Sequence, residues 1–308
     1  MSDLLPWFAS ARADACQRDT ACYASQMQPR VVQWSSVHDF LGAAHDFLAA
    51  REAEHCLLFG IASVVANHPE VYREARFWTV LEGDRVVAAA LRTPPHNLLL
   101  SQIDEPRWLA ALADDVLASD ELPGVFGPTA AAHTLADTWS ARTGRTAIRL
   151  AHERIFRLDR VVAPRPAPGR CREAEERDRA LLAAWWEAFS IEAIPDAPRG
   201  DPAEAADRML RRAGRVAYLW DDAGEVVAFA GASGPTPRGI RIGPVYTPPD
   251  RRGRGYATNL VAAVSELQLA SGRSFCFLFT DLANPTSNHI YQALGYAPVV
   301  DVDHYRFP

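Results

Sequence analysis

The chain has 308 residues, which suits two domains of ordinary size, and 48% of them are hydrophobic, enough for packed cores. Its formal net charge of −6, with Arg interleaved among Asp and Glu, argues against general binding of nucleic acid. The five Cys form no CxxC or Cys/His ligand pattern, and no segment approaches the length of a membrane span. We therefore expect a soluble cytoplasmic protein without a metal site and with no nucleic-acid or membrane partner.

The chain is expected to contain two folded parts. Residues 1–26 are polar and patternless, and we treat them as an N-terminal tail. A Pro-rich segment at 161–170 favours an extended linker and divides the remaining chain nearly in half. The sequence thus predicts one domain at 27–160 and a second at 171–308.

The two halves also resemble each other. The turns at Gly83 and Gly224 both enter an apolar strand, and Pro128 and Pro285 both precede a stretch with the pattern of a helix. These similarities indicate a weak tandem repeat, although common turn chemistry also explains them.

The first elements of the second half can be predicted in chain order. Two helices are expected, and two strands follow, joined by a turn rich in Asp and Gly. In a third strand Ile240 and Ile242 alternate, but Gly243-Pro244 moves Val245 out of phase with them, as a β-bulge would. The expected ranges are helices at about 180–189 and 202–212 and strands at 216–220 and 226–232.

A Gly-rich turn and a helix come next, the helix at about 255–270. A turn of this kind leaves backbone N–H groups unpaired at the positive end of the helix dipole, which suits a diphosphate. A dinucleotide fingerprint needs a third Gly where Thr258 stands, and a P-loop needs a Lys, but all 32 basic residues are Arg. A solvated turn is the plainer alternative. The turn reads Arg252-Gly253-Arg254-Gly255-Tyr256-Ala257.

The last part of the chain predicts a buried strand at 274–280 and a short helix that Asn284 caps and Gly295 ends. This helix has a polar side that carries Asn284, Ser287, Asn288 and Tyr291.

These motifs resemble the GNAT superfamily of acyl-CoA N-acyltransferases. The pattern Arg252-x-x-Gly255-x-Ala257 follows a bulged strand, and Asn284-x-x-Ser287-x-x-x-Tyr291 follows some thirty residues later. The resemblance implies a mixed α/β fold, with two tandem GNAT-like domains whose twisted sheets are flanked by helices and a bulged strand splayed from its neighbour in the second. The first half lacks the glycine loop, so it resembles a degenerate copy.

The resemblance also implies roles for individual residues. Tyr291 would be the general acid that protonates the leaving thiolate, although an aromatic residue packed under the sheet is the alternative. Acetyl-CoA would be the acyl donor, and an N–H near Val245 or Tyr246 would stabilise the developing oxyanion. The coenzyme would be bound by Val245, Tyr246, Thr247, Arg252, Gly253, Arg254, Gly255, Tyr256, Ala257, Thr258, Asn284, Ser287 and Asn288.

No general base can be chosen from the sequence. The bulged strand at 239–246 holds no carboxylate where many members of the family carry a Glu. Glu187 and Glu192 are candidates because they flank the segment that covers the acceptor site in the family, Asp281 is a third, and a water chain is a fourth.

The leading hypothesis is an acetyl-CoA-dependent N-acetyltransferase for a small-molecule amine, with the catalytic site in the second half. The alternative is a regulatory protein that binds acyl-CoA without transferring it. A related transferase that uses aminoacyl-tRNA is a third possibility, but the net negative charge of the chain argues against binding of tRNA. The acceptor and the oligomeric state stay open, with a homodimer as one option.

Overall fold

The computed structural model describes residues 28–119, 121–194 and 198–308, so the predicted tail lies outside the described residues. In the first half the elements are, in chain order, β1 (Arg30–Trp34), α2 (Val37–Ala50), α3 (Cys56–Asn67), β2 (Arg76–Glu82), β3 (Arg85–Arg92), β4 (Leu98–Leu100), α4 (Pro106–Ser119), β5 (Gly124–Pro128), α5 (Thr129–Thr143) and β6 (Ile148–Leu158).

The second half has the same order of strands and α-helices as the first. It also contains short 3₁₀ helices at Glu176–Asp178 and Pro249–Arg251. The expected repeat is therefore present in the structure. Its elements are β7 (Arg170–Glu173), α6 (Arg179–Ala193), α7 (Pro202–Leu210), β8 (Arg215–Asp222), β9 (Glu225–Ser233), β10 (Gly239–Tyr246), α8 (Tyr256–Ala270), β11 (Phe275–Asp281), α9 (Pro285–Ala293) and β12 (Ala297–Arg306).

The local signals in the second half were good predictors. Asp201 and Asn284 cap α7 and α9 through their side chains, as capping residues do. Gly272 follows the end of α8 with φ +100°, a conformation that favours glycine.

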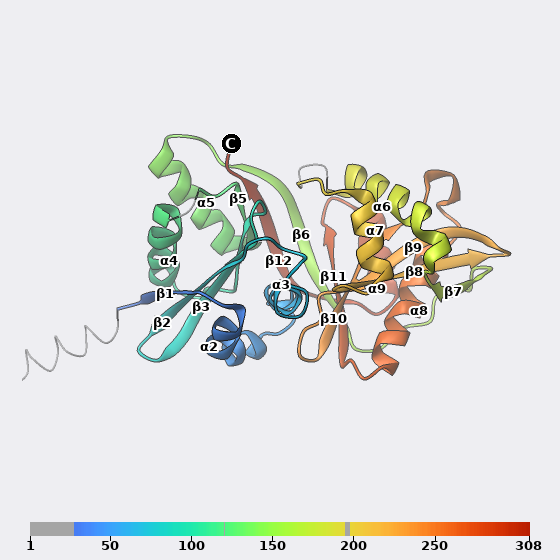
Figure 1. Cartoon of the computed structure of the whole chain (residues 1–308), viewed down its shortest axis with the longest axis horizontal. Coiled ribbons are helices and arrows are strands. Elements are labelled where there is room, and N and C mark those ends of the chain that lie inside the picture. The colour runs from blue at the N-terminus through green and yellow to red at the C-terminus, as the bar shows by residue number, and fades with distance from the viewer. Residues whose placement is uncertain (1–27, 120, 195–197) are drawn as a thin grey trace, which may run out of the picture.

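The described strands form a single 12-stranded sheet in the order β1-β2-β3-β4-β5-β12-β6-β11-β10-β9-β8-β7 (Figure 1). It is mixed, because β4 runs parallel to β5 and β10 runs parallel to β11, whereas the other neighbours are antiparallel. The predicted mixed α/β class is confirmed. Among the described helices, none combines the length and the apolar character needed to cross a membrane.

The two halves exchange their last strands. β6 closes the first half of the chain but pairs with β11, and β12 closes the second half but pairs with β5. β6 and β12 also pair with each other and lie at the centre of the molecule (Figure 1). The Pro-rich linker thus lies between the halves in sequence, while each side of the sheet includes the last strand of the other half.

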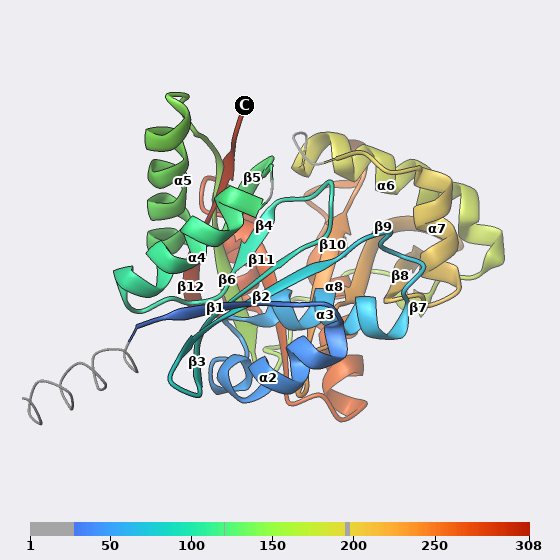
Figure 2. The same cartoon turned by 60° about the vertical axis from the view of Figure 1, so that its left-hand side comes forward.

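Helices cover both faces of each half (Figure 2). In the first half α4 and α5 pack on one face and α2 and α3 on the other. In the second half α8 packs on one face, and α6 and α7 on the other. Since α3 also contacts β10, a helix of the first half lies over the sheet of the second.

Two contacts hold α3 in this place. The segment before α3 carries Glu52, which is 3% exposed and accepts hydrogen bonds from the Thr236 hydroxyl at 2.6 Å and the Arg238 N–H at 2.7 Å. On α3 itself, a Cβ on Gly60 would lie 2.9 Å from the Cα of Gly234, so only glycine permits this approach. These contacts fix the position of α3 against the candidate site.

Candidate active site

The centre of the site is a gap between the parallel strands β10 and β11. They are paired only from Gly239 to Arg241 on β10, which is opposite Phe275 to Phe277 on β11. The register of β10 against β9 shifts between Ile242 and Val245, which confirms the predicted bulge. Beyond this point β10 pairs only with β9 and β11 pairs only with β6, so β10 and β11 splay apart.

The predicted anion-binding turn lies between β10 and α8. Gly253 and Gly255 have φ of +75° and +80°, values that favour glycine and lead the chain into the helix. The first backbone hydrogen bond of α8 runs from the Asn259 N–H to the Gly255 carbonyl. The N–H groups at 256–258 therefore have no partner within the helix and lie at its positive end, where an anion is favoured.

Three arginines surround this turn, and each already has a partner in the chain. Arg251 pairs with Glu225, and a nitrogen of Arg254 lies 3.3 Å from the Asp250 carbonyl oxygen. Arg252 donates to the Thr247 carbonyl at 2.9 Å and to Glu192 at 2.7 Å. Glu192, a candidate base, is thus held in an ion pair beside the turn.

The turn residues that follow have different surroundings. Tyr256 is 5% exposed and donates a hydrogen bond to Asp222 at 2.6 Å, so its side chain belongs to the packing below the turn. Ala257 and Thr258 are half-buried at the helix start. Only the backbone of Tyr256 is placed to meet a ligand.

The linker passes close to the same helix start. The Asn259 side chain donates to the Arg165 carbonyl at 3.1 Å, which brings the exposed Arg165 beside the turn. Sequence reasoning missed this residue, because nothing in a Pro-rich segment indicates which helix it crosses.

The polar side of α9 faces the end of β11. The Asn284 side chain accepts from the Ser287 N–H at 3.0 Å, which confirms its capping role. Asn288 donates to the Asp281 carbonyl at 2.9 Å, so α9 is tied to the strand at the open end of the gap.

Tyr291 follows on the same helix and is half-buried, as is Val245 of β10, and both pack against one core cluster. The centre of the Tyr291 ring lies 6.0 Å from the centre of the Tyr296 ring, in an edge-to-face arrangement. Burial raises the pKa of Tyr291 to about 12, so the phenol keeps its proton at neutral pH. The structure thus gives Tyr291 both a packing contact and the protonation state of an acid.

The strand exchange places one further carboxylate, Glu153 of β6, beside the end of β11. It lies directly opposite Asp281 in the β6–β11 pairing. It shares the face of Ile155, which packs in one cluster with Cys56 of α3. Burial, and then the charge of Asp281, raises the pKa of Glu153 to about 7, with Arg241 acting against this rise.

The other base candidates are less well placed. Glu187 is exposed on α6, Glu192 pairs with Arg252, and Asp281 is exposed and accepts from the Ala283 N–H. Glu153 could not be found from the sequence, since it is in the first half and reaches the gap only through the exchange of β6.

Two buried polar atoms near the gap lack a partner in the described part of the chain. They are Oγ1 of Thr247, at the end of β10, and Oδ1 of Asn288 on α9. A buried acceptor without a donor is costly, so both positions suit a ligand that carries amide or hydroxyl groups. Together with the open helix start, they fit a long ligand with a diphosphate at one end.

Comparison with known proteins assigns this region to a family. Residues 179–296 match the sequence model of the acetyltransferase (GNAT) family. No match was found among the curated proteins.

Solved structures with the same fold extend the comparison to nearly the whole chain. A Drosophila protein is 14% identical with a TM-score of 0.67, covering 91% of this chain and 98% of its own. A GNAT-family acetyltransferase from Colwellia psychrerythraea is 12% identical with a TM-score of 0.54, covering 91% and 100%.

A tandem GNAT protein from the clavulanic acid biosynthesis pathway is 14% identical with a TM-score of 0.54, covering 90% of this chain and 97% of its own. The second half of the chain, over residues 179–296, is a domain of the GNAT acetyltransferase family, and it is set in a fold shared with a tandem GNAT protein.

Proposed function

We propose that this protein is an acetyl-CoA-dependent N-acetyltransferase that acts on the amine of a small molecule. The observation that carries the proposal is the position of the open helix start of α8 beside the splayed strands β10 and β11. A diphosphate at the helix start would lead a thioester into the gap between the strands.

In this proposal the donor is held mainly by backbone groups. The N–H groups at 256–258 bind the diphosphate, and Arg254 and Arg165 lie near enough to the turn to offset phosphate charge. Thr247 and Asn288 accept hydrogen bonds from the arm that follows. The thioester supplies the acetyl group.

The proposed reaction is direct attack of the amine on the carbonyl carbon, forming the C–N bond and breaking the C–S bond. The proton leaving the amine goes to Glu153, directly or through water, and a backbone N–H near Val245 or Tyr246 stabilises the carbonyl oxygen. The Tyr291 phenol donates its proton to the departing sulfur. A base with a pKa of about 7 is half ionised near neutral pH, which suits this role.

Calorimetric titration with acetyl-CoA, followed by assay of thiol release over a panel of amines, tests the proposal. We expect saturable binding and release of thiol that depends on the amine. Binding without any release would favour the regulatory alternative, and absence of binding would overturn both.

A further inference from the structure

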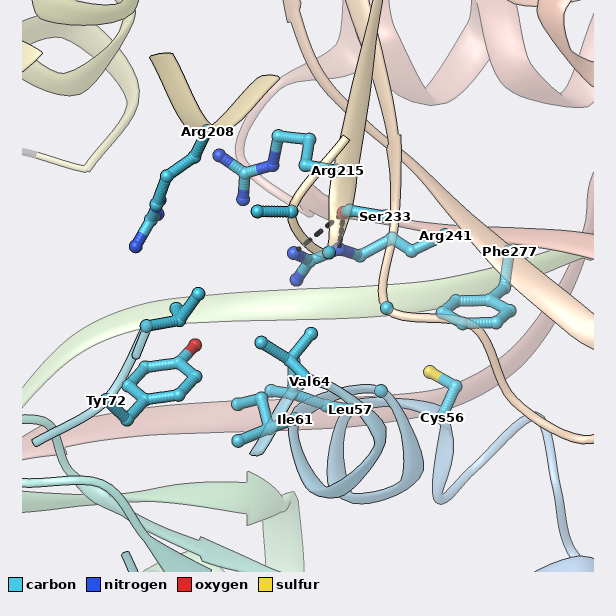
Figure 3. A pocket seen from close by; sticks show the side chains of 15 residues that line it. Cys56, Leu57, Ile61, Val64, Tyr72, Arg208, Arg215, Ser233, Arg241 and Phe277 are labelled. Atoms are coloured by element: carbon cyan, nitrogen blue, oxygen red, sulfur yellow. Dashed lines mark hydrogen bonds between the residues drawn. The ribbon is translucent and has the colours of Figure 1, made fainter. Parts of the chain in front are cut away.

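A pocket with a cavity volume of about 50 Å³ lies between α3 of the first half and the sheet of the second (Figure 3). The wall formed by α3 is apolar, and the opposite wall is basic. The apolar wall includes Leu57, Ile61 and Val64, and the basic wall contains Arg208, Arg215 and Arg241.

The three guanidinium groups are poorly compensated. Nε of Arg215 is buried and has no hydrogen-bond partner in the described part of the chain. Arg241 finds only the Ser233 hydroxyl, at 3.2 Å and 3.4 Å, and Arg208 has no hydrogen bond or ion pair among the described residues. Of the described residues that line the pocket, none is Asp or Glu.

Burial and mutual repulsion make this an unfavourable place for positive charge. Burial, and then the charges of Arg241 and Arg208, lowers the pKa of Arg215 to about 9, so the group is still charged at neutral pH. The guanidinium carbon lies 4.6 Å from the centre of the Trp186 ring. A bound anion would supply the missing acceptors and relieve the repulsion.

The pocket adjoins the gap between the strands. Arg241 and Phe277 both line it, and they form the last pair of the β10–β11 ladder before the strands part. Gly243 of the bulge lies two residues beyond Arg241, a distance of roughly 7 Å along a strand. Tyr72 also lines the pocket, and its hydroxyl is turned toward the arginines (Figure 3).

We propose that this pocket binds a carboxylate or phosphate group of the amine acceptor, with Arg215 and Arg241 as its ligands and Arg208 supporting them. This inference rests on the proposed function and narrows its substrates to anionic amines. The separation of pocket and bulge favours acceptors in which several bonds lie between the amine and the acid. The first half completes the site, since α3 supplies the opposite wall.

A matched set of acceptors tests the inference. We expect 4-aminobutyrate and 3-aminopropyl phosphate to be acetylated with a kcat/KM about tenfold or more above that of butylamine, because only the anions can accept charge-assisted hydrogen bonds from the arginines. The two anions distinguish a carboxylate site from a phosphate site. Equal use of butylamine would overturn the inference and leave the acetyltransferase standing.

Variants then locate the effect. Arg215→Gln and Arg241→Gln should raise the KM for the anionic amine about tenfold. Arg215→Gln should change kcat little and leave butylamine unaffected, whereas Arg241→Gln also removes a charge that lowers the pKa of Glu153, so only its KM is compared. Arg208→Gln is a milder change, because this residue has no partner to lose, and should give a smaller rise in KM. Arg211→Gln, an exposed arginine outside the pocket, is the control. A KM that stays unchanged in all pocket variants contradicts the assignment.

A binding measurement separates this inference from the function on which it rests. 3-Aminopropyl phosphate should raise the melting temperature of the wild type in the presence of saturating coenzyme A, and Arg215→Gln should lose the shift. If acetyl-CoA does not bind but this shift persists without coenzyme A, the function fails and the pocket stands. No shift in the wild type would overturn the pocket.

Discussion

The two halves have the same order of elements, but the corresponding helices α4 and α8 begin differently. In the second half α8 begins with two glycines and unpaired N–H groups. In the first half α4 follows Asp104 and Glu105, and Arg51 binds the Asp104 carboxylate at 2.8 Å and 2.9 Å. One half thus places its own anions before the helix, and the other leaves the position for an anion from outside.

The strands beside these helices differ in the same way. β4 has only three residues, all buried, and the space beyond it is lined mainly by apolar side chains such as Leu99 and Phe126. β10 has eight residues and a bulge, and beyond the bulge it no longer pairs with β11. The comparison teaches that two halves with the same fold can differ in a few backbone positions and charges, and the proposed site depends on these.

The largest effect should come from placing a negative charge before α8, where the first half has carboxylates before α4. Gly253→Asp places a carboxylate in the turn, and Asp tolerates a positive φ better than most residues. We expect acetyl-CoA to bind about a hundredfold more weakly by calorimetry, because the new charge repels the diphosphate.

Gly272→Asp is the matched control, since Gly272 also has a positive φ and open space around its Cβ position but lies at the other end of α8. Normal affinity in Gly253→Asp would show that the turn does not hold the diphosphate.

The second test concerns Tyr291. Tyr291→Phe keeps the ring and its packing but removes the proton donor, so turnover should fall about a hundredfold while the affinity for acetyl-CoA stays within about twofold. Tyr305→Phe, in β12 where it pairs with β5, should leave turnover near normal. A packing role alone would give Tyr291→Phe the same result as Tyr305→Phe.

The third test concerns Glu153, which the first half contributes to the site. As a base with a pKa of about 7, it should make kcat/KM rise with pH through neutrality. Glu153→Gln should remove this rise and lower turnover about thirtyfold at pH 8, with a smaller deficit at pH 6 where the wild type is largely protonated. Glu187→Gln should keep the wild-type profile; if it instead flattens the curve, Glu187 is the base.

The smallest effect is expected for the contact that joins the halves. Glu52→Gln keeps the size of the side chain but weakens its hydrogen bonds to Thr236 and Arg238, so the free energy of unfolding should fall by about 1–3 kcal/mol in denaturant titration. Burial alone would raise the pKa of Glu52, but these hydrogen bonds outweigh it and lower the pKa below the usual value.

The sign of the pH effect follows from that lowered pKa. The stability that Glu52 contributes is present above its unfolded pKa and is lost as the pH falls through the folded one. In acid, Glu52→Gln and the wild type should therefore approach each other in stability. Glu266→Ala, an exposed residue on α8, serves as control.

Much of the second half could be predicted from the sequence because its signals are local. The bulge at Gly243-Pro244, the cap at Asn284 and the glycine after α8 each depend on a few neighbouring residues. The start of α8, where we propose that the donor binds, could also be predicted from a few neighbouring residues. Element bounds were predicted to within a few residues for the same reason.

The rest could not be predicted because it depends on contacts between distant segments. No local pattern indicates that β6 pairs with β11, and so none indicates that Glu153 lies opposite Asp281. The basic pocket combines arginines from α7, β8 and β10 with α3, which is more than a hundred residues earlier in the chain.

The exchange of β6 and β12 has a consequence for biosynthesis. A ribosome makes β12 after every other strand of the sheet, so the edge of β5 stays open until residues 297–306 have left the exit tunnel. An open edge is a template for unwanted pairing with other chains. The first half therefore cannot complete its part of the sheet until the last strand of the second half has been made.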